Sequence, residues 1–194
     1  NPDEWLSNYD ILDVLNQYES KYKNFKILGP TPINFDSKDM NNKEKCVWDD
    51  LCNFSLNKYI KKKIDKIGVI FNLAKQGEEG THWVSLFIDL KHKYIFYFDS
   101  NGEECPNEIK ELIIRIKEQG KGKNIKLKEI YNKVEHQSTN TECGMYSLYF
   151  IITLLTEEIN GKKIKNTDRL LSHFYKHRIP DYLVFKHRSI YFNE

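Results

Sequence analysis

One apolar run constrains the fold more than any other feature of the chain. Residues 146–155 read YSLYFIITLL, interrupted only by Ser147 and Thr153. The run is too short to span a bilayer, which needs about 20 apolar residues. We therefore expect it to form a buried helix inside a folded domain. A polar stretch, HQSTNTE, comes directly before it, and Cys143 stands at the junction.

The composition agrees with a single packed domain over residues 1–194. Of the 194 residues, 40% are hydrophobic and 13% aromatic, which suits one core with at most a small accessory lobe. The 30 basic and 28 acidic residues nearly cancel, so the net charge gives no support to DNA binding. With no N-terminal signal pattern visible, we expect a soluble intracellular protein without membrane contact.

The four cysteines are Cys46, Cys52, Cys105 and Cys143. None forms a CxxC pair, so we expect no metal site. They are too sparse for a disulfide scaffold in a chain of this length, and a reducing compartment is the simpler interpretation. The pattern assigns no role to Cys46, Cys52 or Cys105.

Local patterns predict an α+β fold, in which a small mixed β-sheet is flanked by helices. Ser7 can cap a first helix, and Asp10 completes a capping box. Gly120 is expected just past the end of an amphipathic helix. The predicted elements are strands over 67–74, 81–100 (a hairpin) and 124–134, a helix within 107–122 that ends before Gly120, and a helix over 143–155.

Three larger segments complete this prediction. The core of the domain is expected over about 68–155. It follows an N-terminal helical segment, 1–60, in which GPTPINFD (29–36) is a turn-rich connector. It precedes C-terminal helices over 166–194.

Cys143 is a candidate nucleophile. A helix that begins there would direct unsatisfied backbone N–H groups toward the sulfur and favour the thiolate. Thr141 is a candidate N-cap, and Gly144 would leave the backbone beside the sulfur open to a substrate chain. The alternative is a small buried hydrophobic residue, the usual fate of a free cysteine. From this stretch alone, the alternative is stronger.

The predicted hairpin offers the base and the orienting group that a nucleophilic cysteine needs. If its strands pair about Leu90–Lys91, His82 lies opposite Asp99, about 5 Å away at Cβ. Asp89 is a competing partner, but it would lie about 23 Å from His82 at the turn. Alternatively, His82 is a structural histidine and Asp99 a turn residue. A pairing of His82 with Asp99, found together with a cysteine at a helix start, favours the catalytic interpretation.

The polar loop before Cys143 contains two more candidates. Gln137 could donate its side-chain amide to a developing oxyanion, together with the Cys143 backbone N–H. The alternative is a solvated loop glutamine. His136 is a rival base without an acidic partner. The other histidines lie at the hairpin turn (His92) or look like surface residues (His173, His177 and His187).

The ordered set His82-Trp83, Asp99, Gln137 and Cys143-Gly144 resembles a superfamily of cysteine peptidases. Its members include the SUMO-specific proteases and the adenovirus maturation protease, adenain. The stretch WLSNYDI near the start is similar to the first helix of that family, although this chain has Asn where Asp is common. Within the superfamily, the chain most resembles maturation proteases of large DNA viruses, such as that of African swine fever virus.

The resemblance implies a cysteine endopeptidase without metal or organic cofactor. In it, Cys143 is the nucleophile, and His82 is general base and acid. Asp99 orients His82, and Gln137 supplies the oxyanion hole. Trp83 would shape the wall of the cleft. The implied substrates are capsid or core precursor proteins, cut at Gly-Gly-x or Gly-x-Gly sites in the virus factory, host cytoplasm or virion.

Other functions stay open at this point. A deSUMOylase or deubiquitinase acting on ubiquitin-like modifiers would use the same triad. Acetyl transfer, found in a related bacterial effector family, would need acetyl-CoA and tends to use Glu where this chain has Asp99. The presence of all four candidate residues, His82, Asp99, Gln137 and Cys143, argues against a catalytically dead binding module. We expect specificity to come from the loop 75–80 and the segment 34–54, for which no structure is predicted.

Overall fold

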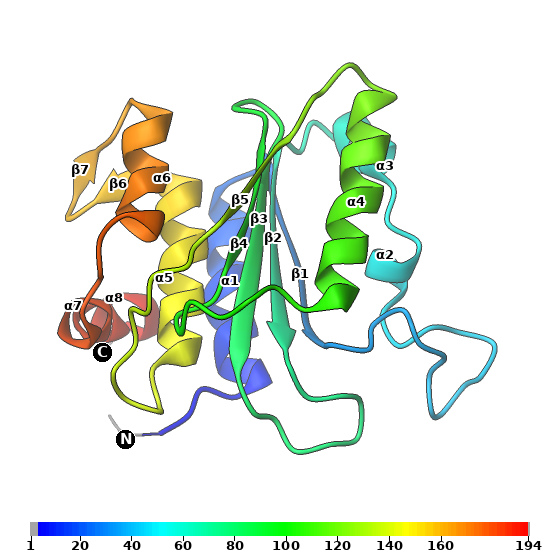
Figure 1. Ribbon diagram of the computed structural model, residues 1–194, viewed down its shortest axis with the longest axis horizontal. Helices are drawn as coiled ribbons and strands as arrows, with labels where there is room; N and C mark the ends of the chain where they lie inside the picture. Colours follow the sequence, from blue (N-terminus) through cyan, green and yellow to red (C-terminus); the bar gives the residue numbers. More distant parts are fainter. Residues whose placement is uncertain (1–3, 194) are drawn as a thin grey trace.

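A mixed sheet forms the centre of the computed structural model, which describes residues 4–193 (Figure 1). Its neighbouring strands are, in order, β1 (Phe25–Pro32), β2 (Lys66–Asn72), β3 (Trp83–Asp89), β4 (Tyr94–Phe98) and β5 (Lys128–Tyr131). The pairs β1–β2 and β4–β5 are parallel, and the two central pairs are antiparallel. The predicted α+β class with a small mixed sheet is confirmed.

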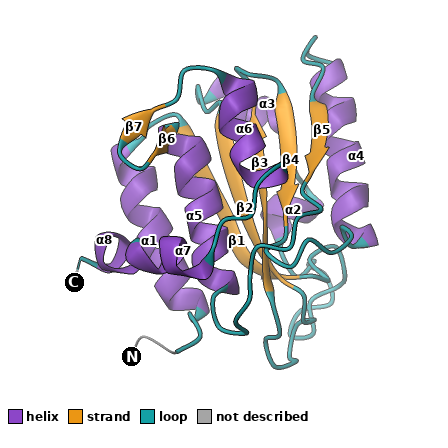
Figure 2. Cartoon of the chain, turned by 60° about the vertical axis from the view of Figure 1, so that its left-hand side comes forward, coloured by secondary structure: helices purple, strands orange, loops and turns teal. Residues whose placement is uncertain are grey.

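Helices cover both faces of this sheet (Figures 1 and 2). One layer contains α1 (Asn8–Lys21), α5 (Cys143–Thr156), α6 (Thr167–Tyr175), α7 (Asp181–Lys186) and α8 (Arg188–Phe192). The other contains α2 (Asp49–Cys52), α3 (Leu56–Lys61) and α4 (Asn107–Lys121). A short hairpin of β6 (Glu158–Ile159) and β7 (Lys162–Lys163) follows α5.

The sheet separates two hydrophobic cores, because side chains alternate between the faces of a strand. On β3, Phe87 belongs to the core shared with α5, whereas Leu86 belongs to the core shared with α4. On β4, Phe96 and Tyr97 divide in the same way. The central strands are therefore apolar on both faces, as a strand between two helical layers must be.

Helix α5 is buried on every side. All its residues from Cys143 to Leu155 lie in the interior, which accounts for the apolar run in the sequence. Gly68 on β2 lets the helix come close, since a Cβ there would lie 3.1 Å from Cγ2 of Ile151 and 3.3 Å from the ring of Phe25. Among the described residues, no helix combines the length and apolar character that a membrane span requires.

Helix α1 begins as predicted. The Ser7 hydroxyl accepts a hydrogen bond from the Asp10 backbone N–H at 3.2 Å, and the Asp10 carboxylate accepts one from the Ser7 N–H at 2.7 Å. These reciprocal bonds satisfy donors that a helix start otherwise leaves unpaired. The apolar residues Ile11, Val14 and Leu15 of α1 are buried.

Two boundary predictions are wrong. The segment 1–60, predicted as helical, contains β1, whose last residues were assigned to a connector. Gly29 has a φ of +91°, and a Cβ there would lie 2.6 Å from the Ile70 carbonyl oxygen. Gly120 lies inside α4 rather than past its end. A glycine is needed there because a Cβ would lie 2.7 Å from the Ile125 carbonyl oxygen. Both glycines serve close backbone approaches.

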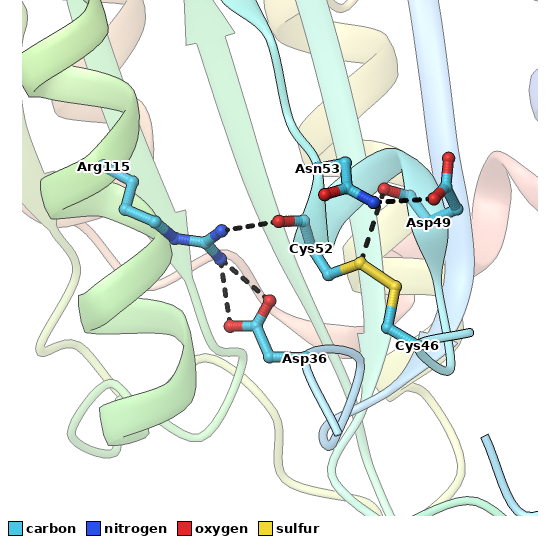
Figure 3. The surroundings of a disulfide bond; sticks show 6 residues. All are labelled: Asp36, Cys46, Asp49, Cys52, Asn53 and Arg115. Carbon is cyan, nitrogen blue, oxygen red and sulfur yellow. Dashed lines mark hydrogen bonds and ion pairs between the residues drawn. A yellow bond between two sulfur atoms is a disulfide. The ribbon is translucent and has the colours of Figure 1, made fainter. Parts of the chain in front are cut away.

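A disulfide lies in the segment 34–54 (Figure 3). It joins Cys46 to Cys52, a bridge that the interpretation of a reducing compartment did not predict. Arg115 of α4 holds the same segment through both carboxylate oxygens of Asp36, at 3.0 and 2.9 Å, and through the Cys52 carbonyl oxygen at 3.1 Å. The segment is thus connected to the α4 layer at two points.

The C-terminal histidines differ from their predicted surface character. His177 is exposed, but His173 and His187 are half-buried against Tyr149. The Tyr149 hydroxyl lies 2.8 Å from Nε2 of His173, and the rings of Tyr149 and His187 are 4.9 Å apart. Burial, with smaller effects from the charges of His136 and His177, lowers the pKa of His173 to about 4.

We predict that His173→Gln makes the protein less sensitive to acid. The unfolded chain binds a proton on His173 near pH 6.5, whereas the folded protein does so only near pH 4. Its contribution to stability is therefore full above pH 6.5 and is lost as the pH falls toward 4. Urea denaturation at about pH 7 and pH 4.5 should show the variant gaining relative to wild type at the lower pH. His177→Gln, which removes only one of the smaller effects on His173, should gain less than His173→Gln. An equal difference at both pH values for His173→Gln would contradict the prediction.

We also predict that Gly68→Ala destabilises the fold by about 1–3 kcal/mol, because the added methyl group overpacks the contact between α5 and β2. Ile151→Val shortens the side chain that the methyl group meets, so the same change should cost less in that background. Gly122→Ala, at an exposed helix end with ordinary φ, is the matched control and should be nearly neutral. Equal costs for Gly68→Ala with and without Ile151→Val would refute this account.

Candidate active site

The structure brings His82 and Asp99 together at one end of the central strands. His82 directly precedes β3, and Asp99 directly follows β4. Nε2 of His82 lies 2.7 Å from Oδ1 of Asp99, whose side chain is 1% exposed. The competing carboxylate, Asp89, binds His92 instead at the hairpin turn, at 2.8 Å. The predicted contact between His82 and Asp99 is therefore present.

The register that led to this contact was nevertheless wrong. Ser85 pairs with Phe98, whereas the predicted register would pair it with Phe96. Continued by one residue, the observed register puts Asp99 opposite Val84 and makes His82 a diagonal neighbour of Asp99. A shift by two residues keeps every side chain on its face of the sheet, so His82 still reaches Asp99.

Asn132, which the sequence analysis missed, holds Asp99 in place. Its side-chain nitrogen donates to the Asp99 carbonyl oxygen at 2.8 Å, and its side-chain oxygen accepts the Asp99 N–H at 3.0 Å. The Asn101 backbone N–H also donates to Oδ1 of Asp99, at 2.9 Å. The only signal in the sequence was a polar residue near the end of the predicted strand 124–134, directly after the observed end of β5.

The protonation of His82 depends on its two neighbours. Burial by itself would lower the pKa of His82, but the hydrogen bond to Asp99, the interaction with Cys143 and the charges of both raise it to about 10. Nε2 faces Asp99, which leaves Nδ1 as the ring nitrogen available to the thiol. A cationic imidazole held by a carboxylate beside a sulfur is the arrangement that activates a cysteine nucleophile.

Cys143 is the first residue of α5, as predicted, but its surroundings differ in two respects. Glu142, not Thr141, is the N-cap residue. Gly144 does not open the backbone to a substrate, because a Cβ there would lie 3.1 Å from Cβ of Leu6 and 3.3 Å from the ring of Trp83. Cys143 itself is 1% exposed, so its approach is narrow.

Gln137 lies in the loop before α5, and its side chain is oriented by specific contacts. Its Oε1 accepts a hydrogen bond from the Ser100 hydroxyl at 2.6 Å, and its Nε2 donates to the Thr139 carbonyl oxygen. An amide nitrogen carries two hydrogens, so one remains for another acceptor. The Gln137 backbone N–H donates to the Ser100 carbonyl oxygen at 3.0 Å. Ser100 directly follows Asp99, so the same strand end holds both side chains.

His136 is not a rival base. It is fully buried, with Nε2 2.8 Å from the Phe174 carbonyl oxygen, and its Nδ1 accepts the Ile179 backbone N–H at 2.9 Å. Nε2 therefore carries the proton and both ring nitrogens are occupied. Burial lowers the pKa of His136, which keeps the ring neutral.

Trp83 lies beside His82 and is nearly buried. Its indole N–H donates to the Leu6 carbonyl oxygen at 3.2 Å. The ring also lines a pocket of about 210 Å³ that the loop 75–80 borders. Gln76 in that loop accepts the Met40 N–H and donates its own N–H to Asn34, so the loop contacts the segment 34–54.

Two groups of metal-ligand type occur in the described part of the chain. In one, Cys46 and Cys52 form the disulfide beside Asp49. In the other, Asp89, His92 and Glu157 lie close together, but the buried ammonium group of Lys66 lies 3.1 Å from Glu157 and supplies positive charge there. Neither group adjoins Cys143, and neither takes part in the arrangement described above.

Comparison with known proteins identifies relatives of this chain. Residues 23–176 match the family model for the Ulp1 protease family, C-terminal catalytic domain. A putative thiol protease of Acanthamoeba polyphaga mimivirus, R355, is 36% identical over 84% of this chain and 52% of its own length. The cysteine protease S273R of African swine fever virus is 25% identical over 95% of this chain and 66% of its own length. The chain thus spans between half and two thirds of these relatives.

Solved structures show the same fold. The crystal structure of the African swine fever virus pS273R protease superposes with a TM-score of 0.76 at 23% identity, covering 97% of this chain and 67% of that one. The Ulp1 protease domain, solved in complex with the yeast SUMO ortholog Smt3, superposes with a TM-score of 0.54 at 20% identity, covering 95% and 78%. With most of its length matched by the family model, the chain belongs to the Ulp1 family of cysteine proteases.

Proposed function

We propose that this chain is a cysteine endopeptidase in which Cys143 is the nucleophile and His82 the general base and acid. The observation that carries the proposal is the position of His82, hydrogen-bonded to Asp99 and interacting with Cys143. Asp99 orients the imidazole and stabilises its charged form. Gln137 and the Cys143 backbone N–H, at the start of α5, are the proposed oxyanion donors.

The reaction proceeds in two stages. With the thiol proton held on His82, the sulfur of Cys143 attacks the scissile carbonyl carbon, and the carbonyl oxygen becomes an oxyanion. As the C–N bond breaks, His82 gives its proton to the leaving amine, and a thioester remains. His82 then takes a proton from water, whose oxygen attacks the thioester and releases the carboxylic acid and Cys143.

For substrates, we propose structural precursor proteins of a large DNA virus, cut at Gly-Gly-x or Gly-x-Gly sites. Relatives from mimivirus and African swine fever virus support a viral setting. Cys143 is 1% exposed, and Leu6 and Trp83 pack beside the adjacent Gly144. This supports small residues beside the scissile bond, because a peptide without bulky side chains needs least displacement.

A second candidate is cleavage of ubiquitin-like modifiers from their conjugates. Several African swine fever virus relatives are named SUMO-1 cysteine protease, and one structural neighbour is a Ulp1 domain bound to Smt3. The same site would serve both activities, since both candidate substrates place small residues at the cut. The two candidates differ in whether a folded modifier is recognised.

We predict a graded loss of activity across the proposed triad. Cys143→Ala and His82→Ala should each lower kcat by about 10³-fold or more, and Asp99→Ala should cost less than His82→Ala, because Asp99 transfers no proton. The measurement is peptide cleavage by purified variants of similar melting temperature. Cys105→Ala, which changes the other free buried cysteine, should keep its activity. Full activity in Cys143→Ala would refute the mechanism, and full activity in His82→Ala would refute the choice of base.

A second prediction separates the two substrate classes. Cleavage-site profiling of a virus-infected host lysate, with Cys143→Ala as the blank, should give cuts clustered at Gly-Gly-x or Gly-x-Gly in structural proteins. SUMO and ubiquitin vinyl sulfone probes should label Cys143 weakly. Rapid labelling by either probe, without cuts in structural proteins, would favour the modifier protease instead.

A further inference from the structure

The loop that carries Gln137 is held from outside by a segment near the C-terminus. Asp181, the first residue of α7, accepts hydrogen bonds from two successive backbone N–H groups of this loop. The Ser138 N–H lies 3.1 Å from both of its carboxylate oxygens, and the Thr139 N–H lies 3.1 Å from Oδ2. The two residues that follow Gln137 are therefore bound to one carboxylate.

The same carboxylate is connected to α5. The Tyr146 hydroxyl, on the buried first turn of that helix, lies 2.8 Å from Oδ1 of Asp181. It also lies 2.6 Å from the Ile179 carbonyl oxygen and 3.2 Å from that of His136. Because Cys143 begins this helix, Asp181 and Tyr146 set the position of the Gln137 loop relative to the sulfur.

The residue before Gln137 is fixed by neighbours of Asp181. Both ring nitrogens of His136 bond to the segment 174–179, as described above. Arg178 donates from Nε to the His136 carbonyl oxygen at 3.1 Å and also contacts the Ser138 hydroxyl. The C-terminal segment thus holds the loop on both sides of Gln137.

We propose that Asp181 is a positioning residue for the oxyanion donor. It acts through the loop backbone and does not touch the reacting atoms, while Ser100 sets the side-chain rotamer of Gln137 from the other side. The inference rests on the proposed role of Gln137. Asp181 lies outside residues 23–176, which match the family model.

Loss of the contact between Asp181 and the Gln137 loop is expected to have a large effect on the rate of cleavage. Removing one correctly placed oxyanion donor lowers kcat by about 10²–10³-fold. A displacement of about 1 Å can cost about 100-fold in rate. Hydrogen bonds from backbone N–H groups to a carboxylate are stronger than neutral ones, so one side chain suffices to hold the loop.

The test is a double-mutant cycle between Asp181→Asn and Gln137→Ala, measured as kcat and KM on a fluorogenic peptide that carries the cleavage site of the wild-type enzyme. Asp181→Asn keeps the shape but puts an amide group where a charged acceptor stood. We expect it to lower kcat about 10-fold or more with KM within about 3-fold, the signature of an interaction made in the transition state. In the Gln137→Ala background, the same change should lower kcat by less than about 2-fold.

Two controls separate positioning from general damage. Asp168→Asn makes the same change in the first turn of α6, at an exposed site, and should leave kcat unchanged. Alkylation of Cys143 by iodoacetamide requires no oxyanion hole, so its rate should be unchanged in Asp181→Asn. If Asp181→Asn folds poorly, Tyr146→Phe replaces it in the test. This variant removes only the hydroxyl group and is expected to show the same loss of kcat.

The failures can be told apart. If Gln137→Ala lowers kcat but Asp181→Asn and Tyr146→Phe do not, the positioning role is overturned and the oxyanion role stands. Equal losses from Asp181→Asn in both backgrounds, or a parallel fall in alkylation rate, also overturn positioning. If Gln137→Ala keeps full kcat, both the oxyanion role and this inference are overturned.

Discussion

The burial of α5 is the constraint on which the rest of the structure depends. A helix that is apolar on every side needs partners around its whole circumference. The sheet supplies one side, and α1, α6 and α7 supply the others. At the far end, the ammonium group of Lys66 donates to the Leu155 carbonyl oxygen at 3.1 Å, which satisfies an acceptor that the helix end leaves unpaired. The first residue of the helix, Cys143, is immobile for the same reason.

A second point of organisation is the end of β4. Asp99 binds His82, and the adjacent Ser100 binds Gln137 through its hydroxyl and through its carbonyl oxygen. Two residues in succession thus place the proposed base and the proposed oxyanion donor on one strand end. Because α5 packs tightly on the same sheet, the distance between this strand end and Cys143 is set by the core. The geometry of the candidate site follows from the contact between helix and sheet.

Some errors of the sequence interpretation were harmless, and others were not. The hairpin register was wrong by two residues, yet His82 and Asp99 met, because a shift by two preserves the face. Strand β1 was missed because Gly29 and its neighbouring prolines resemble a connector, whereas the parallel pairing with β2 tolerates them at a bulge. The role of Gly144 was wrong, since local sequence does not tell that Leu6, distant along the chain, occupies the space beside it.

The amino-acid sequence by itself determined the buried helix, the capped first helix, the hairpin and the order of the candidate site residues. All of these depend on patterns within a few residues or on a single hairpin. Only the tertiary structure decided that His136 is a structural histidine, that Asn132 holds Asp99 and that Asp181 holds the loop of Gln137. These contacts join residues far apart along the chain, and their partners are backbone groups, which carry no signature in the sequence.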